Sequence, residues 1–302
     1  MRIRVIELPL DFGASRRGSD MGPSAMRLAG LKKTLVDLGH EPEECFPGIS
    51  VPAQEFVEEG DGSAKFLAPI ADACDELAGR VEGAVDDGTF PLVLGGDHSI
   101  AIGTLSGLGA AYRKRGLRWG TLWVDAHGDF NTPESSPSGN IHGMSLAVAC
   151  GLGRKELTGL HGDFRKLDPT NTALVGVRDL DPLEKKNMRS AGLTVFTMTD
   201  VDRLGIAEAT RRIVAFFKER VDALHVSVDM DVMDPMIAPG VGIPLPGGFS
   251  YREVLLLAEE LAGSGLLRSA EIVEVNPVLD VRNQTARMAV EIAARLLGAT
   301  SY

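Results

Sequence analysis

Short apolar runs alternate with segments of helical periodicity along most of this sequence. Runs rich in branched apolar residues predict buried strands at residues 2–8, 91–94, 118–124, 172–177, 193–196, 223–228 and 268–274. Apolar residues three or four positions apart predict helices at residues 23–38, 64–87, 99–114, 144–150, 182–191, 206–219, 250–263 and 284–297. We expect a further short strand near 46–49 and irregular structure at 151–170 and 232–249.

The alternation of strands and helices predicts an α/β fold. At this spacing, we expect a three-layer α/β/α sandwich with a mainly parallel central sheet. The chain has 302 residues, a length that suits one large domain or two ordinary ones. It contains no sequence repeat, low-complexity segment or linker, so we expect a single domain covering residues 1–302.

A dense group of metal-type ligands follows the predicted strand 118–124. Its apolar run ends in Asp125, His127 and Asp129. Residues two apart in an extended chain point to one face, so these side chains would converge if the extended geometry persisted beyond the strand. Carboxylates and an imidazole gathered in a small volume need a cation to offset repulsion and desolvation. Asp-rich loops after strands are common, however, so this stretch alone leaves a metal site and an ordinary loop equally open.

Two more predicted strands end in the same way. Asp229 and Asp231 end the run that begins at residue 223, and Asp97 and His98 end the run that begins at residue 92. In open parallel sheets, sites form outside the carboxyl ends of the strands. We therefore expect one metal centre there, with the candidate ligands His98, Asp125, His127, Asp129, Asp229 and Asp231.

The number of candidate ligands favours two metal ions over one. Four carboxylates carry a charge of −4, which two divalent cations and one bridging hydroxide nearly neutralise. Ligation dominated by oxygen with some imidazole suits Mn²⁺, with Zn²⁺, Co²⁺ and Fe²⁺ as alternatives.

Three sequence blocks of this chain resemble the motifs of the ureohydrolase family. They are GGDHS, DAHGDFN together with SGNIHG, and SVDMDVMDP. Within the family, the SPSGNIHG segment resembles arginases rather than agmatinases, and the resemblance extends from GPSAMR near the start to EVNP near the end. It implies a cofactor of two Mn²⁺ per subunit and a homotrimer or homohexamer. The implied reaction converts L-arginine to L-ornithine and urea, by attack of a metal-bridging hydroxide on the guanidinium carbon.

The same resemblance implies roles for individual residues. Asp129 would protonate the departing amine, His142 would shuttle protons to solvent, and Glu274 would bind the substrate guanidinium. The residues implied to bind the α-carboxylate and α-ammonium groups are Asn131, Ser138, Asn140, Asp181 and Glu184. Glu271, three residues before Glu274, is expected to be structural. Ile243 stands where arginases often carry Thr, so the resemblance does not extend to a hydroxyl contact near the guanidinium, and we expect any consequence in substrate affinity rather than in the metal chemistry.

Composition narrows the partners and the compartment. The net charge of −11 argues against nucleic acid, and no apolar run approaches the ~20 residues needed to span a membrane. The N-terminal residues lack the pattern of a secretory signal. The three cysteines, Cys45, Cys74 and Cys150, fit no disulfide or zinc framework, so we expect reduced thiols in a cytoplasmic protein.

Other functions compete with arginine hydrolysis. An agmatinase, or a hydrolase of another guanidino acid, would use the same metal chemistry on a different substrate. A metal-dependent deacylase would need one metal and fewer ligands than the six found here. A non-catalytic metal-binding protein would require neither His142 nor Glu274, and both are present.

Overall fold

The strands of this computed structural model, which describes residues 1–44, 48–53 and 56–300, form one parallel sheet. Within the described residues the sheet has eight strands, in the order β2-β1-β3-β8-β7-β4-β5-β6. Their bounds are β1 Arg2–Leu8, β2 Glu41–Glu44, β3 Phe90–Gly95, β4 Trp119–Val124, β5 Thr172–Val177, β6 Thr194–Thr197, β7 Ala223–Asp229 and β8 Leu267–Val273. Every described strand pair is parallel, which agrees with the predicted sheet.

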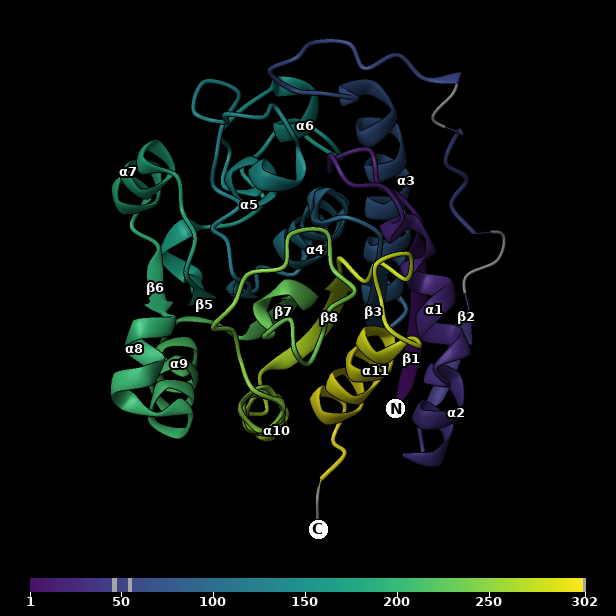
Figure 1. Ribbon diagram of the computed structural model, residues 1–302, viewed down its shortest axis with the longest axis vertical. Coiled ribbons are helices and arrows are strands. Elements are labelled where there is room, and N and C mark those ends of the chain that lie inside the picture. The colour runs from purple at the N-terminus through teal and green to yellow at the C-terminus, as the bar shows by residue number, and fades with distance from the viewer. Residues whose placement is uncertain (45–47, 54–55, 301–302) are drawn as a thin grey trace.

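Helices cover both faces of this sheet (Figure 1). Their bounds are α1 Gly22–Leu28, α2 Leu31–Asp37, α3 Leu67–Asp86, α4 Ala101–Lys114, α5 Ser145–Ala149, α6 Lys155–Thr158, α7 Pro182–Ala191, α8 Met198–Leu204, α9 Ile206–Arg220, α10 Tyr251–Gly263 and α11 Gln284–Leu296. One core cluster packs α1, α2, α9, α10 and α11 against the sheet, and the other packs α3, α4 and α5 against the opposite face. Alternate residues of β3 illustrate the division, since Leu92 and Leu94 join the first cluster and Val93 joins the second. The predicted α/β/α sandwich is confirmed.

The structure differs from the predicted elements in four places. The helix expected at 23–38 is two helices, because Gly30 adopts a left-handed φ of 96° between them. Strand β2 lies at Glu41–Glu44 rather than near 46–49, where residues 45–47 fall outside the described part of the chain. Its Pro42 is tolerated because β2 pairs only with β1, at the sheet edge. Helix α6 lies in the segment expected to be irregular, and α8 was not predicted.

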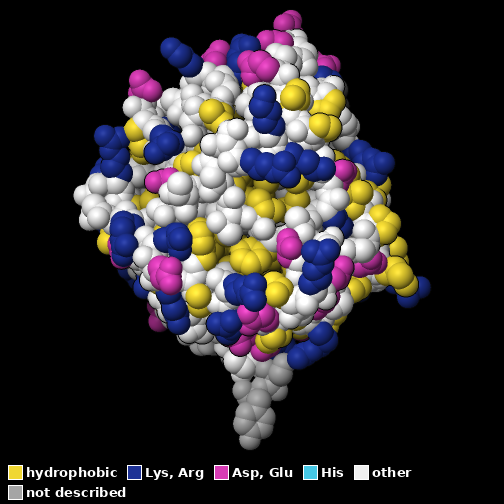
Figure 2. All heavy atoms as spheres, turned by 90° about the vertical axis from the view of Figure 1, so that its left-hand side faces the viewer, with side chains coloured by type: hydrophobic (Ala, Val, Ile, Leu, Met, Phe, Trp, Pro, Cys, Tyr) yellow, Lys and Arg dark blue, Asp and Glu magenta, His cyan; other side chains and the backbone are white. Residues whose placement is uncertain are grey.

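Strand β6 forms the other edge of the sheet, on the side of the molecule that Figure 2 faces. Lys, Arg, Asp and Glu side chains are interspersed over this face, with apolar side chains between them (Figure 2). Mixed charges around an edge strand discourage pairing with a strand of another molecule. No helix in the described ranges is long and apolar enough to cross a membrane.

The strand order places the predicted ligands together. Strands β3, β8, β7 and β4 are consecutive neighbours in the centre of the sheet. His98 follows β3, Glu274 follows β8, Asp229 ends β7 and Asp125 follows β4. Because the strands are parallel, all four side chains start from the same edge, where their carboxyl ends meet.

Candidate metal centre and substrate pocket

His98 is held at its position by a glycine turn and a capped 3-10 helix. A Cβ at Gly96 would overlap the backbone of Leu10, so only glycine allows the chain to leave β3 at this point. Asp97 then caps the helix His98–Ile100, because its Oδ1 accepts a hydrogen bond from the backbone N–H of Ser99 at 2.8 Å. The imidazole of His98 is consequently buried beneath the edge of the sheet.

A turn, rather than an extended strand, brings the ligands after β4 together. Strand β4 ends at Val124, and Oδ1 of Asp125 accepts a hydrogen bond from the N–H of His127 at 2.6 Å. Asp129 has a left-handed φ of 48°, which redirects the chain a second time. Our expectation that extended geometry would align these residues is therefore wrong, although they still converge.

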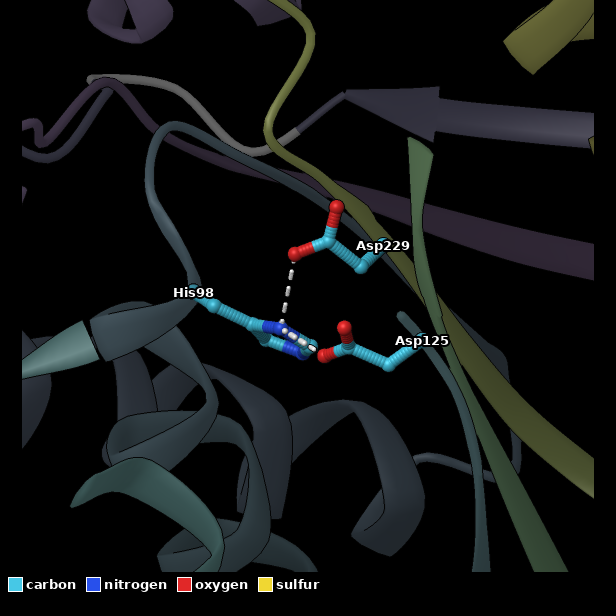
Figure 3. A group of neighbouring side chains, drawn as sticks. All are labelled: His98, Asp125 and Asp229. Carbon is cyan, nitrogen blue, oxygen red and sulfur yellow. Dashed lines mark hydrogen bonds and ion pairs between the residues drawn. The ribbon is translucent and has the colours of Figure 1, made fainter. Parts of the chain in front are cut away.

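The carboxylates converge on one nitrogen of His98. Its Nδ1 lies 3.2 Å from Oδ2 of Asp125, 3.1 Å from Oδ2 of Asp129 and 3.1 Å from Oδ2 of Asp229. Figure 3 shows the carboxylates of Asp125 and Asp229 directed at this nitrogen. Three carboxylates around one ring nitrogen concentrate negative charge where a cation would bind.

A second group shares Asp125 with the first. Nδ1 of His127 lies 3.4 Å from Oδ1 of Asp125 and 3.0 Å from Oδ2 of Asp231. Two sets of atoms are spaced closely enough to hold a metal ion, namely His98 with Asp125 and Asp229, and Asp125 with His127 and Asp231. Asp125 therefore contributes one oxygen to each set.

The ionisation of these groups responds to the crowding. Burial, followed by the charges of Asp231 and Asp125, raises the pKa of Asp229 well above its usual value. Burial also raises the pKa of Asp129, with the charge of Asp125 adding to the effect. For His98, burial alone would lower the pKa, but hydrogen bonds to Asp125, Asp129 and Asp229 outweigh it and raise the pKa well above 6.5. Without a metal ion, the protonated imidazole of His98 supplies the positive charge that the surrounding carboxylates require. A divalent cation would supply the same charge, so it fits this donor set.

Most of the predicted site residues line a single pocket. Its lining includes His127, Asp129, Asn131, Ser138, Asn140, His142, Asp181, Glu184, Asp229, Asp231, Ile243 and Glu274. His98 and Asp125 do not line the pocket and lie buried beneath it. The structure therefore gathers all the predicted site residues in one region, with the ligand groups at its base.

His142 and Glu274 interact with each other at this pocket. Nδ1 of His142 lies 3.3 Å from Oε1 of Glu274, which also accepts a hydrogen bond from the N–H of His98 at 2.9 Å. Burial opposes the charge on His142, but Glu274 outweighs it and raises the pKa of His142 to about 9. His142 is therefore a proton donor at neutral pH rather than the unperturbed imidazole that the sequence suggests.

Glu184 lines the pocket, and each of its carboxylate oxygens accepts one backbone hydrogen bond. Oε1 accepts a hydrogen bond from the N–H of Phe130 at 2.9 Å, and Oε2 accepts one from the N–H of Asp181 at 3.1 Å. The second bond completes a capping box at the start of α7. Glu184 thus ties the chain beside Asp129 to α7, and burial raises its pKa to about 7.

Sequence reasoning overlooked several residues that support the centre. The indole of Trp123 stacks on the imidazole of His98 with ring centroids 4.0 Å apart, and its Nε1 donates to Asp125 at 2.9 Å. The guanidinium of Arg178 donates to the backbone carbonyls of Asp231 and Val232, at 2.8 and 3.1 Å. Trp123 shares a sheet face with Asp125 by strand alternation, and this was the available signal. Nothing in the sequence indicated the partners of Arg178.

Comparison with known proteins agrees with this geometry. The profile of the arginase family matches residues 1–298. The sequence is 48% identical to the arginase of Bacillus caldovelox over 98% of each chain, and 45% identical to that of Bacillus subtilis strain 168 over 98% of this chain and 97% of the other. The chain belongs to the arginase family.

A solved structure supports membership of the arginase family at the level of the fold. The native arginase of Bacillus caldovelox at pH 5.6 superposes with a TM-score of 0.94 at 47% identity, covering 100% of this chain and 99% of the other. The predicted resemblance to arginases is confirmed, and so is the prediction of an arginase-family hydrolase.

Proposed function

We propose that this protein hydrolyses L-arginine to L-ornithine and urea, with two Mn²⁺ ions held by the six predicted ligands. The observation that carries the proposal is the pair of ligand groups sharing Asp125 at the base of a polar pocket. His98, Asp129 and Asp229 surround one position, and His127 and Asp231 surround the other. The donors are mostly carboxylate oxygens with one imidazole for each position, which suits Mn²⁺.

The bound ions would offset the buried carboxylate charge and make a water molecule nucleophilic at neutral pH. The surrounding residues would orient the substrate and move protons. Glu274 would pair with the guanidinium, because a carboxylate can accept two parallel N–H bonds from it. Asp129, at the base of the pocket, would give a proton to the departing amine.

His142 would exchange protons between the pocket and solvent. Its side chain is 15% exposed, so it reaches water while it contacts Glu274. Its raised pKa keeps the imidazole protonated at neutral pH, ready to replace a proton that the chemistry consumes.

Four polar residues that line the pocket offer partners for the α-carboxylate and α-ammonium groups of the substrate. They are Asn131, Ser138, Asn140 and Asp181. Ser138 and Asn140 adjoin each other, since the N–H of Asn140 donates to Oγ of Ser138 at 3.2 Å. Nδ2 of Asn131 donates to Oδ2 of Asp181 at 3.0 Å, which fixes both side chains before substrate arrives. We assign the α-carboxylate to Asn131, Ser138 and Asn140, and the α-ammonium to Asp181 with Glu184 behind it.

Comparing arginine with agmatine tests this assignment. Agmatine lacks the α-carboxylate, so it would not form the hydrogen bonds that Asn131, Ser138 and Asn140 would donate to that group in arginine. We expect kcat/KM for L-arginine to exceed that for agmatine by at least about 100-fold, measured as urea release in the presence of Mn²⁺. Replacing Asn131 and Ser138 with Ala should reduce this ratio, mainly by impairing arginine. Equal values for the two substrates in the unmodified protein would reject the arginine assignment and favour an agmatinase.

We also propose a domain organisation, an oligomeric state and a cytoplasmic location for this protein. We infer that residues 1–302 form a single domain, because one sheet contains strands from both ends of the chain. We infer a homotrimer or homohexamer, which the molar mass from light scattering would report. Cys74 and Cys150 are buried free thiols, which agrees with a cytoplasmic protein.

A further inference from the structure

A line of polar side chains runs from the candidate metal centre into the hydrophobic core. Nε2 of His98 lies 2.8 Å from Oγ of Ser227, on the side of the ring away from the carboxylates. Ser227 is paired in register with Glu271 on the neighbouring strand β8, so the two side chains share one face of the sheet. Oε1 of Glu271 in turn lies 3.5 Å from Nε2 of His225.

Glu271 and His225 are fully buried and incompletely paired. Both have no solvent-exposed surface. Three buried atoms of this pair lack a hydrogen-bond partner in the described part of the chain. They are the two carboxylate oxygens of Glu271 and Nε2 of His225. Nδ1 of His225 contacts Oγ of Ser269 at 2.9 Å, which fixes the ring from its other side.

A purely structural role accounts poorly for this pair. Burying charged groups without full hydrogen bonding reduces stability, and apolar residues of similar volume in such positions are often neutral or stabilising. Val93 and Val273, which lie on the same face as Glu271, show that apolar side chains also pack at this position. The polar pair therefore requires another reason for its presence.

The location of the carboxylate supplies that reason. Nδ1 of His98 faces the three ligand carboxylates, so with a cation bound there the proton of the neutral ring lies on Nε2 and is donated to Ser227. Glu271 lies beside Ser227 on the neighbouring strand. His225 precedes Ser227 by two residues on β7 and therefore lies further from the metal centre, which is at the carboxyl end of the strand. Glu271 is thus the member of the pair nearer His98, where the charge of a carboxylate favours the cation-bound imidazole.

We propose that Glu271, which lies beside His225, is a positioning residue that strengthens metal binding by His98. The proposal rests on the metal centre of the proposed function. It assigns Glu271 no contact with substrate or metal. The negative charge behind Ser227 fixes the orientation and tautomer of His98 and increases the affinity of the position formed by His98, Asp125 and Asp229.

Calorimetric titration of Mn²⁺ into the metal-free full-length protein tests the proposal. In Glu271→Gln, which removes the charge at nearly constant volume, one of the two Mn²⁺ dissociation constants should increase by about tenfold and the other by less than about twofold. Glu271→Asp keeps the charge and should recover part of the loss. The matched control is Thr121→Val, because Thr121 is fully buried on the same face and paired in register with His225 but carries no charge. Both of its dissociation constants should stay within about twofold of the native values.

A second variant guards against misfolding of Glu271→Gln. His225→Leu combined with Glu271→Leu removes the buried carboxylate and imidazole together and costs only the contact to Ser269, so the melting temperature of the metal-free protein should fall little or not at all. The same single Mn²⁺ site should still weaken. Unchanged Mn²⁺ constants in this variant or in Glu271→Gln, or equal weakening of both sites in step with a loss of melting temperature, would overturn the inference. Failure of the native protein to bind two Mn²⁺ would instead reject the proposed function.

Discussion

Individual ligand residues determine how many cations the centre holds. Asp229 contacts His98 and belongs to the ligand group of His98 and Asp125, but not to the group around His127. We therefore predict that Asp229→Ala loses at least one Mn²⁺ per chain, measured by elemental analysis, together with nearly all urea release. The control is Asp222→Ala, because Asp222 precedes the same strand and pairs with Arg118 at 2.8 Å on the protein surface. Two retained Mn²⁺ in Asp229→Ala would remove Asp229 from the ligand set.

The contact between His142 and Glu274 gives the metal-free protein a defined pH dependence. Because the pKa of His142 is raised to about 9 in the folded state, its stabilising effect is complete below the unfolded value near 6.5 and is lost as pH rises through about 9. We predict an NMR titration midpoint near 9 for His142, and a decrease in unfolding free energy between about pH 6.5 and 9. Glu274→Gln should move the midpoint towards 6.5. A midpoint near 6.5 in the native protein would show that the contact does not affect the proton of His142.

The sequence predicted that the candidate site residues lie close together, but it did not predict which contacts they make. Each ligand stands at or just after the end of an apolar run, so a parallel sheet was enough to place His98, Asp125 and Asp229 at one edge. Glu184 was predicted to contact substrate, and the structure adds hydrogen bonds from the backbone N–H groups of Phe130 and Asp181 that the prediction did not include. The bond from Asp181 is a local capping box three residues long, whereas the bond from Phe130 joins segments 54 residues apart, and a sequence without three-dimensional distances does not reveal it.

Among the elements, helix α4 holds the segment that carries His98, and it packs closely against α3. A Cβ at Gly107 would overlap the carbonyl oxygen of Ala78, and one at Gly103 would lie 2.6 Å from the carbonyl oxygen of Cys74. These glycines let the two helix backbones approach each other. The approach fixes α4 and therefore the start of the 3-10 helix at His98.

We predict that Gly107→Ala lowers the unfolding free energy by about 1–3 kcal/mol through overpacking. The matched control is Gly79→Ala on α3, where a Cβ would meet nothing within 4 Å. This replacement should raise the unfolding free energy by up to about 1 kcal/mol, because alanine favours a helix interior more than glycine. Urea denaturation of both variants provides the comparison. Equal effects would indicate that α3 and α4 are not closely packed at Gly107.

Elements with strong periodicity were predicted well, and those at the periphery were not. Strands β3, β4 and β7 are buried along their whole length, so their sequences are dominated by apolar residues. Strand β2 reads EPEE, and its strand conformation depends on pairing with β1 rather than on its own residues. The break between α1 and α2 depends on one glycine, whose left-handed backbone the apolar periodicity does not report.

At the scale of the whole molecule, strand order is the feature that creates the site. The central order β3-β8-β7-β4 brings together segments that begin at residues 90, 267, 223 and 119. Alternating strands and helices predicted a parallel sheet, but which strands become neighbours depends on packing between distant segments. The site could therefore be predicted as a set of strand ends, while its sharing of Asp125 between two groups required the structure.

The central claim is that two Mn²⁺ ions bound by this constellation hydrolyse L-arginine. Titrating Mn²⁺ into the metal-free protein while measuring urea release from L-arginine tests it most directly. We predict that activity is absent without metal and reaches its maximum at two equivalents of Mn²⁺ per chain, because each of the two ligand groups sharing Asp125 must be filled. Full activity at one equivalent, or no urea at any Mn²⁺ concentration, would contradict the account.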